Sequence, residues 1–130
     1  MIERISSGGP WEEAFGYSRA VLAGDMAFVA GCTSVVDGEV VHVGDAYEQA
    51  RTAFQVALWS LERLGLSAKD VVRTRMYVTG AEHAEAVGRA HGSLFGDVRP
   101  ASSLLLVAGL IDPRMLVEVE VDAYAGELLT

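Results

Sequence analysis

The stretch that decides the fold is Leu116–Tyr124, L-V-E-V-E-V-D-A-Y, in the last fifteen residues of the chain. Apolar and polar residues alternate through it, so they point to opposite faces of an extended strand. One face carries only small apolar side chains, and the other carries acids and a tyrosine: Val117, Val119, Val121 and Ala123 against Glu118, Glu120, Asp122 and Tyr124. The pattern predicts a strand with one face in the core.

Two further runs, Met26–Ala30 and Val71–Val78, are rich in β-branched or aromatic residues and end at turn residues, so they are also predicted strands. Ile2–Ser6, Ser18–Ala23 and Val40–Val43 give weaker strand signals. The run Leu104–Val107 is apolar on both faces and therefore needs cover on both sides. Because helices can cover only one of these faces, this strand favours an oligomer. Val36-Asp37-Gly38-Glu39 is typical of a turn.

Helical spacing marks two segments. From Asp45 to Leu64 the apolar residues form one stripe, Asp45 is a suitable N-cap, and Gly65 stands where a helix ends. A second helix is predicted from about Ala81 to Phe95, with Thr79 and Glu82 as a capping box. The order is strands, helix, strand, helix and two strands. It predicts one α+β domain over residues 1–130, with both helices on one face of the sheet.

Composition narrows the function. The chain has 130 residues and a formal net charge of −8, and its ten basic residues form no run, which argues against a nucleic-acid binder. The single cysteine, Cys32, fits a reducing compartment. No apolar run approaches the roughly 20 residues of a membrane span. We therefore expect a cytoplasmic protein with no membrane partner.

Four segments resemble the RidA (YjgF) family: F-G-Y-S-R-A at Phe15–Ala20, F-V-A-G-C-T at Phe28–Thr33, D-V-V-R-T-R-M-Y-V-T at Asp70–Thr79, and the run from R-P-A-S-S to V-E-V-E-V-D-A at Arg99–Ala123. The last is similar to the family signature R-P-A-R, followed by an apolar strand, a turn and V-E-I-E. The four segments stand in the family's order and cover nearly the whole chain.

The resemblance implies a chorismate-mutase-like fold, a six-stranded, mostly antiparallel sheet with two helices on one face, assembled as a homotrimer with ligand clefts between subunits. It also implies hydrolysis of reactive enamine or imine intermediates, which releases ammonia and a 2-keto acid without a cofactor. Other members are called ribonucleases or translation inhibitors.

The chain departs from the family at its cleft. The arginine that follows P-A and grips the substrate carboxylate is Ser102 here, and a hydroxyl cannot neutralise a carboxylate. The serine and glutamine of the family's S-G-Q turn appear as Ala30 and Cys32. Two polar groups remain, Tyr17 and Glu118, the first acid of V-E-V-E. The resemblance makes them the catalytic candidates, with Ser102, Cys32 and Ala30 as substrate-binding positions.

Arg99 precedes Pro100 near the supposed cleft and is the candidate replacement for the missing anchor. Arg73 and Arg75 share a strand face and are expected to pair with the acids of the last strand. Arg114 is expected in a solvated turn.

Each candidate also has a structural interpretation. Tyr17 can pack on a sheet edge, and Glu118 can be an ordinary ion-pair acid. Cys32 has no neighbouring His or Lys in the sequence, so an inert small hydrophobe is favoured over a nucleophile. His91, on an apolar helix face, is typical of a packed histidine. The histidines show no metal-ligand spacing, so no metal is expected.

Three hypotheses remain. The first is a RidA-like hydrolase in which Glu118 and Tyr17 position a water that attacks an iminium carbon. The second is a non-catalytic trimer that binds a small molecule, suggested by Ser102. The third, an endoribonuclease or translation inhibitor, rests on family naming alone, and the net charge of −8 argues against it.

Overall fold

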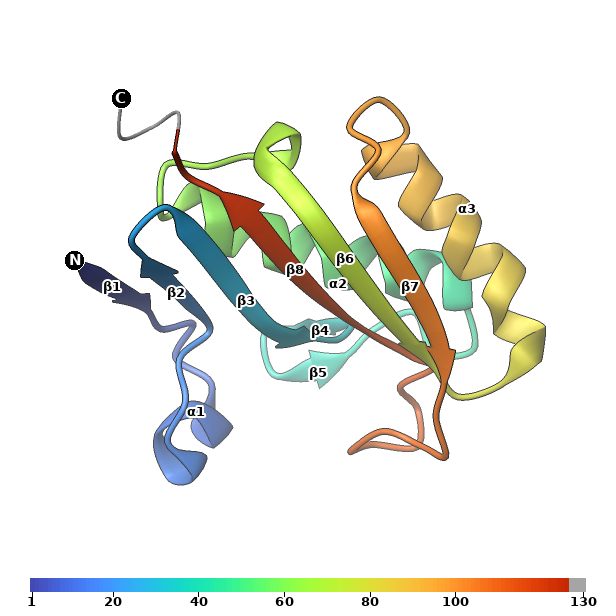
Figure 1. Cartoon of the computed structure of the whole chain (residues 1–130). Coiled ribbons are helices and arrows are strands. Elements are labelled where there is room, and N and C mark those ends of the chain that lie inside the picture. The colour runs from blue at the N-terminus through green and yellow to red at the C-terminus, as the bar shows by residue number, and fades with distance from the viewer. Residues whose placement is uncertain (127–130) are drawn as a thin grey trace.

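The computed structural model describes residues 1–126, and six strands in it form one sheet. They are β1 (Ile2–Ile5), β2 (Ala20–Ala23), β3 (Met26–Cys32), β6 (Val71–Val78), β7 (Ala101–Leu106) and β8 (Val117–Tyr124). Their order across the sheet is β1-β2-β3-β8-β6-β7 (Figure 1). All neighbours are antiparallel except β6 and β7, which are parallel. The predicted six-stranded, mostly antiparallel sheet is confirmed.

The alternation of Val117–Tyr124 has the predicted consequence. The valines of β8 are fully buried, whereas its acids remain partly exposed on the other face. β8 lies in the middle of the sheet, between β3 and β6, so its apolar face forms the centre of the core. β6 follows the same rule, because Thr74, Met76 and Val78 are buried.

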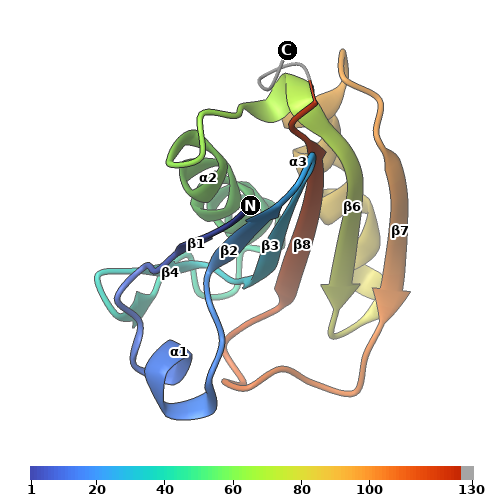
Figure 2. The same ribbon diagram turned by 60° about the vertical axis from the view of Figure 1, so that its left-hand side comes forward.

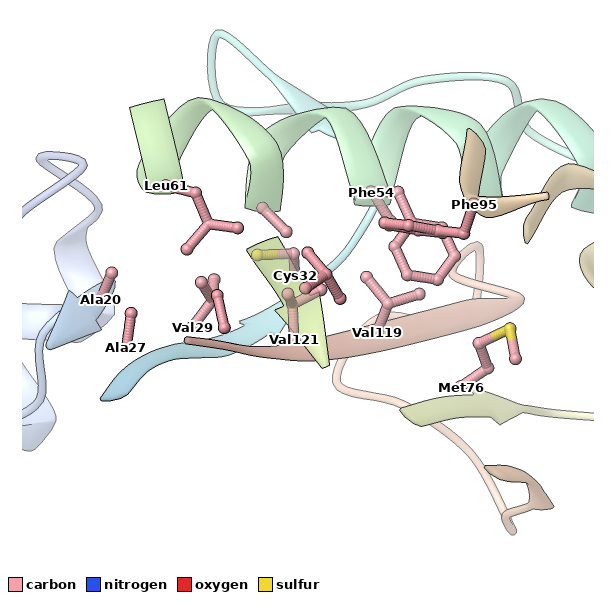
Figure 3. Packing of buried hydrophobic residues seen from close by; sticks show 14 of the residues in the cluster. Ala20, Ala27, Val29, Cys32, Phe54, Leu61, Met76, Phe95, Val119 and Val121 are labelled. Atoms are coloured by element: carbon pink, nitrogen blue, oxygen red, sulfur yellow. The ribbon is translucent and has the colours of Figure 1, made fainter. Parts of the chain in front are cut away.

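Two helices, α2 (Ala46–Glu62) and α3 (Ala84–Phe95), cover one face of the sheet (Figure 2). The Asp45 side chain accepts a hydrogen bond from the backbone N–H of Glu48 at 3.1 Å and so caps α2 as expected. Figure 3 shows Phe54 and Leu61 of α2 above the valines of β3 and β8, with Phe95 of α3 beside Phe54. Burying a side chain of this size stabilises the fold by about 1.5–3 kcal/mol.

Two local predictions were wrong, and one helix was missed. The helix predicted from Ala81 begins with a 3-10 turn, η2 (Ala81–His83), and neither N-terminal cap uses a side chain, so the Thr79–Glu82 capping box does not form. The strand predicted at Val40–Val43 is instead the end of a short hairpin, β4 (Val35–Val36) and β5 (Glu39–Val40), around the predicted turn. A short helix, α1 (Pro10–Phe15), was not predicted.

β3 contains an irregularity that shapes the site. Its pairing with β8 is regular from Met26 to Val29 and shifts register between Val29 and Cys32, which is a β-bulge at Ala30–Gly31. A bulge kinks its strand and re-aims the nearby side chains. A second 3-10 turn, η1 (Ala68–Asp70), leads into β6. Of the helices in the described part of the chain, none has the length and apolar character that a bilayer span requires.

The face of the sheet opposite the helices has no cover within the described chain. It carries the acids of β8 and the arginines of β6, and apolar side chains such as Phe28 and Leu105 are 45% and 44% exposed there. We call it the open face. The exposure of Leu105 agrees with the expectation that the apolar strand Leu104–Val107 needs cover on both sides.

Candidate functional site

Arg19 stands at the entry to β2, where the backbone already joins the sheet. Its N–H donates to Ile5 O and its carbonyl accepts from Ala30 N, both at 2.9 Å. The guanidinium then reaches the bulge of β3. Nη1 donates to Gly31 O at 2.6 Å and to Ala30 O at 3.3 Å, and it lies 3.5 Å from Cys32 Sγ. The bulge therefore has a cation fixed on its carbonyls.

Glu118 lies against the same bulge from the neighbouring strand. A Cβ on Gly31 would overlap the Oε2 and Cδ atoms of Glu118, so the carboxylate occupies space that only glycine leaves free. Burial raises the pKa of Glu118, and the charge of Glu120 raises it further, while Arg19 opposes both. A carboxyl group with a raised pKa is suited to take up and release a proton near neutral pH.

Tyr17 joins this group through Arg19, whose guanidinium carbon lies 5.8 Å from the centroid of the tyrosine ring. α1 places Tyr17 there: Gly16 ends the helix with φ 79°, and Tyr17 N donates to Glu12 O at 2.9 Å. The Tyr17 side chain is 41% exposed and can reach a ligand. We call Tyr17, Arg19, Cys32 and Glu118, around Gly31, the Glu118 cluster.

Glu12 completes the charge balance of the Glu118 cluster. Its Oε2 lies 3.8 Å from Arg19 Nε. Burial opposes ionisation of Glu12, but hydrogen bonds from the hydroxyl and N–H of Ser7 outweigh burial and lower its pKa. Glu12 therefore stays ionised beside the guanidinium, while Glu118 forms no ion pair with Arg19 among the described contacts.

The open face explains why Glu118 has no cross-strand partner. Tyr77 lies directly opposite Glu118, but its hydroxyl donates to Glu120, one pair further along β8. Arg75 lies opposite Glu120 but pairs with Asp122 at 3.5 Å. Tyr77 and Arg75 thus each contact the acid that follows their own partner on the same face of β8. Of the two arginines predicted to pair with the acids of β8, Arg75 does so, whereas Arg73 makes no ion pair within the described residues. Because the contacts are displaced in this way, Glu118 has no partner on β6 and lies against the bulge of β3.

Cys32 is a core residue. It pairs with Val119, is 2% exposed, and its thiol donates to Ala30 O at 3.2 Å. Burial raises its pKa to about 11, although the nearby Arg19 favours the thiolate. A thiol that remains protonated is a poor nucleophile, which agrees with the structural interpretation of this residue.

Ser102 belongs to a second group, on β7. Thr74 Oγ1 donates to Ser102 Oγ at 2.8 Å and lies 2.8 Å from Nε2 of His91, on α3. His91 packs against Phe54 and Phe95 with centroid distances of 5.6 and 4.9 Å, and burial lowers its pKa. At neutral pH this chain of side chains therefore carries no charge.

Arg99 stands beside that group. It has a left-handed backbone, φ 61°, and it lines a cavity of about 360 Å³ together with Pro100 and the end of α3, namely His91, Gly92, Phe95 and the capping Gly96. We call Thr74, His91, Arg99 and Ser102 the Ser102 cluster. It combines an exposed hydroxyl, a neutral imidazole and one cation, which suits a small polar ligand.

The two clusters do not meet within one chain. Glu118 projects from the open face, whereas Ser102 contacts Thr74 and, through it, a helix on the other face. β6 also lies between β8 and β7. The structure thus brings Tyr17, Glu118, Cys32 and Ala30 together and leaves Ser102 and Arg99 apart from them.

Arg114 lies in a turn, as expected, where its Nη2 is 2.8 Å from Oδ2 of Asp112.

Two contributors were missed in the sequence: Arg19 and Thr74. Arg19 stands in the quoted F-G-Y-S-R-A segment, but only the bulge of β3 shows what its side chain reaches. Thr74 lies in an apolar strand face, where a lone hydroxyl is the signal of a buried hydrogen bond. Within residues 1–126, no three His, Cys, Asp or Glu side chains gather in a way that could hold a metal ion.

Comparisons with known proteins agree on the family. The model of the family described as endoribonuclease L-PSP matches residues 11–125. An uncharacterised protein of Streptomyces coelicolor is 47% identical over 96% of this chain and 93% of its own. The 3-aminoacrylate deaminase RutC of Acinetobacter baylyi is 30% identical over 79% of this chain and 82% of its own.

Solved structures show the same fold. A member of the YjgF family from Mycobacterium tuberculosis superimposes with a TM-score of 0.86 at 41% identity, covering 95% of this chain and 99% of that one. The YjgF gene product of Escherichia coli gives a TM-score of 0.78 at 26% identity, covering 93% and 92%. The fold expected from the sequence resemblance is therefore confirmed.

Proposed function

The chain belongs to the endoribonuclease L-PSP family, that is, the YjgF or RidA family, and from this premise we propose that it hydrolyses the C=N bond of small enamine or imine metabolites. The observation that carries the proposal is the seat of Glu118: a carboxyl group with a raised pKa, held over Gly31 beside a fixed cation and an exposed tyrosine. General acid–base catalysis requires a positioned group of this kind, which can accept and donate a proton.

The chemistry follows from that placement. An enamine first takes a proton from water on its carbon and becomes an iminium ion. Ionised Glu118 then accepts a proton from a water molecule as its oxygen bonds to the iminium carbon, which gives a carbinolamine. Glu118 returns its proton to the nitrogen, the C–N bond breaks as ammonia leaves, and the hydroxyl group loses its proton to water as the carbonyl forms. Tyr17 lies where its hydroxyl can orient the water or the substrate. The balance is one imine and one water to one carbonyl compound and one ammonia, with no cofactor consumed.

We propose further that the cleft forms between subunits of a homotrimer. The separation of the Glu118 cluster from the Ser102 cluster supports this, since a second copy that covers the open face can bring its own Ser102 cluster toward Glu118. The exposed Phe28 and Leu105 supply apolar surface for such a contact. The partners would then be a small-molecule ligand and two further copies of the chain, with no nucleic acid and no membrane. A protein with one buried, unpaired thiol suits the reducing cytoplasm.

The deciding experiment measures hydrolysis of 2-aminoacrylate, generated in the assay by a dehydratase, and of 3-aminoacrylate, the substrate in the name of the Acinetobacter baylyi relative. Wild type is compared with Glu118→Gln and Ser102→Arg. We expect turnover by wild type and its loss in Glu118→Gln. Acceleration by Ser102→Arg alone would mean that the cleft works but prefers a ligand without a carboxylate at that position.

The second candidate is a non-catalytic trimer that binds a small molecule. The uncharged chain from Ser102 through Thr74 to His91, where deaminating members have an arginine, favours it. No turnover by any of the three proteins, combined with thermal stabilisation by a metabolite, would select this alternative. RNA degradation by the pure protein would select the endoribonuclease instead, which the net charge of −8 argues against.

A further inference from the structure

We infer that Arg19 binds the carboxylate of the substrate, so that the anchor missing at Ser102 is supplied from the opposite side of the cleft, beside Glu118. The inference deepens the proposed function and rests on it. It specifies the substrate class: imino or enamino acids whose carboxylate is within reach of the C=N carbon. It also reassigns the anchor, because the sequence pointed to Arg99.

The guanidinium of Arg19 is already ordered. Nη1 is fixed on the carbonyls of Gly31 and Ala30, and the plane lies over the Tyr17 ring. The side chain is only 12% exposed. Binding to a fixed guanidinium loses less side-chain entropy than binding to a mobile one. Arg99 has an exposed side chain with no hydrogen bond to a described residue, and lacks this advantage.

Arg19 also retains donors for a ligand. Nη2 has no hydrogen bond to any described residue, and Nε has only Glu12 at 3.8 Å, beyond hydrogen-bond distance. A guanidinium with two adjacent N–H groups available matches the two oxygens of a carboxylate. Tyr17, on the face of the same guanidinium, adds a hydroxyl for the same ligand or its water.

The charges beside Arg19 are consistent with this role. Glu12 stays ionised and partly balances the cation, but it is held by Ser7 rather than by a hydrogen bond from Arg19. Glu118 makes no ion pair with Arg19 among the described contacts: it lies against the Cα of Gly31, whereas Arg19 binds the Gly31 carbonyl. A substrate carboxylate on Nη2 would place the substrate carbon near Glu118 and favour the protonated acid that ammonia release requires.

The test compares a carboxylate substrate with its neutral analogue. Steady-state kinetics are measured with 2-aminoacrylate and with the corresponding carboxamide, for wild type, Arg19→Gln and Arg19→Lys. The matched control is Arg63→Gln, because Arg63 is also an arginine over an aromatic ring, 5.1 Å from that of Trp59, but is the exposed residue that ends α2. We expect Arg19→Gln to raise KM for the carboxylate at least tenfold and to leave KM for the carboxamide within twofold.

Arg19→Lys, which keeps the charge but loses the paired donors, should fall between wild type and Arg19→Gln, and it serves as the test if Arg19→Gln does not fold. Arg63→Gln should match wild type for both substrates. An equal rise in KM for carboxylate and carboxamide would show that Arg19 only stabilises the bulge through its hydrogen bonds, and would overturn the inference. The inference would also be overturned if the preference for the carboxylate over the carboxamide disappeared in Arg99→Gln and persisted in Arg19→Gln.

A binding measurement separates this inference from the proposed function. Calorimetric titration with 2-oxobutanoate, a 2-keto acid of the product class, needs no turnover. If wild type binds 2-oxobutanoate but hydrolyses no substrate, and Arg19→Gln does not bind it, Arg19 is supported as the carboxylate anchor and the hydrolase is rejected. Turnover by wild type with 2-oxobutanoate binding unchanged in Arg19→Gln would support the hydrolase and reject the anchor.

Discussion

The carboxylate of Glu118 occupies the space that a side chain on Gly31 would fill. This relationship joins two strands at the one place where their pairing is irregular, because Gly31 belongs to the bulge of β3 and Glu118 to β8. The smallest residue in the site thus determines where the candidate catalytic acid lies.

Gly31→Ala therefore tests the placement of Glu118. The added methyl group would meet the end of a flexible side chain rather than the backbone, so Glu118 can swing away and the fold survives. We expect the variant to keep a melting temperature close to that of wild type and to lose most of its kcat for 2-aminoacrylate. Circular dichroism melts and steady-state kinetics measure the two quantities.

Gly88→Ala is the matched control for that glycine substitution. Gly88 lies in α3, and nothing stands within 4 Å of where its Cβ would be. Alanine favours a helix interior by about 0.5–1 kcal/mol over glycine, so this variant should be more stable than wild type in urea. If kcat is unchanged in Gly31→Ala, the proposal that Gly31 positions Glu118 for catalysis is contradicted.

The pH dependence of stability tests the environment of Glu118. Its pKa is raised in the folded protein, chiefly by burial, so folding favours the protonated acid. The stability that protonated Glu118 contributes is fully present below its unfolded pKa and is lost as pH rises through its folded pKa. Glu118→Gln should therefore melt higher than wild type at pH 8, with a difference that shrinks toward pH 4. Glu62→Gln, at an exposed position on α2, should show no such trend.

Tyr77→Phe tests the displaced contacts of the open face. The substitution removes one hydrogen bond to Glu120, which corresponds to about 0.5–1.5 kcal/mol in the free energy of unfolding. Urea titration of wild type and variant gives this difference. The Glu120 contact also raises the pKa of Tyr77, so ultraviolet titration of the tyrosines should lose in the variant a component that ionises above the ordinary tyrosine range.

Cys32 should be slow to alkylate in the folded protein. With a pKa of about 11, only roughly one thiol in a thousand is ionised at pH 8. Reaction with iodoacetamide should be at least on the order of a hundredfold slower than for the same chain in urea, followed by mass spectrometry. Rapid labelling of the folded protein would show that Cys32 is a reactive thiol and reopen the nucleophile hypothesis.

The fold could be predicted largely because its central strand has a clear sequence pattern. β8 alternates without exception, and α2 has both a cap and a stripe, so local pattern and tertiary position agree. α1 was missed because six residues with Trp11 and Phe15 exposed have no apolar periodicity. The start of α3 was misplaced because Thr79 and Glu82 match a capping box by type, while the chain enters through a 3-10 turn at Ala81.

The site was predictable only in part. Tyr17 and Glu118 stand in recognisable segments, and the structure places both around Gly31. The reach of Arg19 depends on a register shift in β3, which no local pattern reveals. The displaced contacts of Tyr77 and Arg75 depend on side-chain length and sheet twist, so the residues that face each other are not those that bond.

The central place of β8 also determines when the chain can fold during its synthesis. β8 pairs with β3 on one side, Met26 facing Tyr124, and with β6 on the other, so the middle of the sheet is supplied by a strand that is synthesised after both of its neighbours. Until then β3 and β6 each present an unpaired edge, which is a template for association with other chains. Pairs so distant in sequence also form slowly. The nascent chain must therefore remain unaggregated until Val117–Tyr124 has been synthesised, and a premature stop before Val117 yields two half-sheets with no centre rather than a shortened protein.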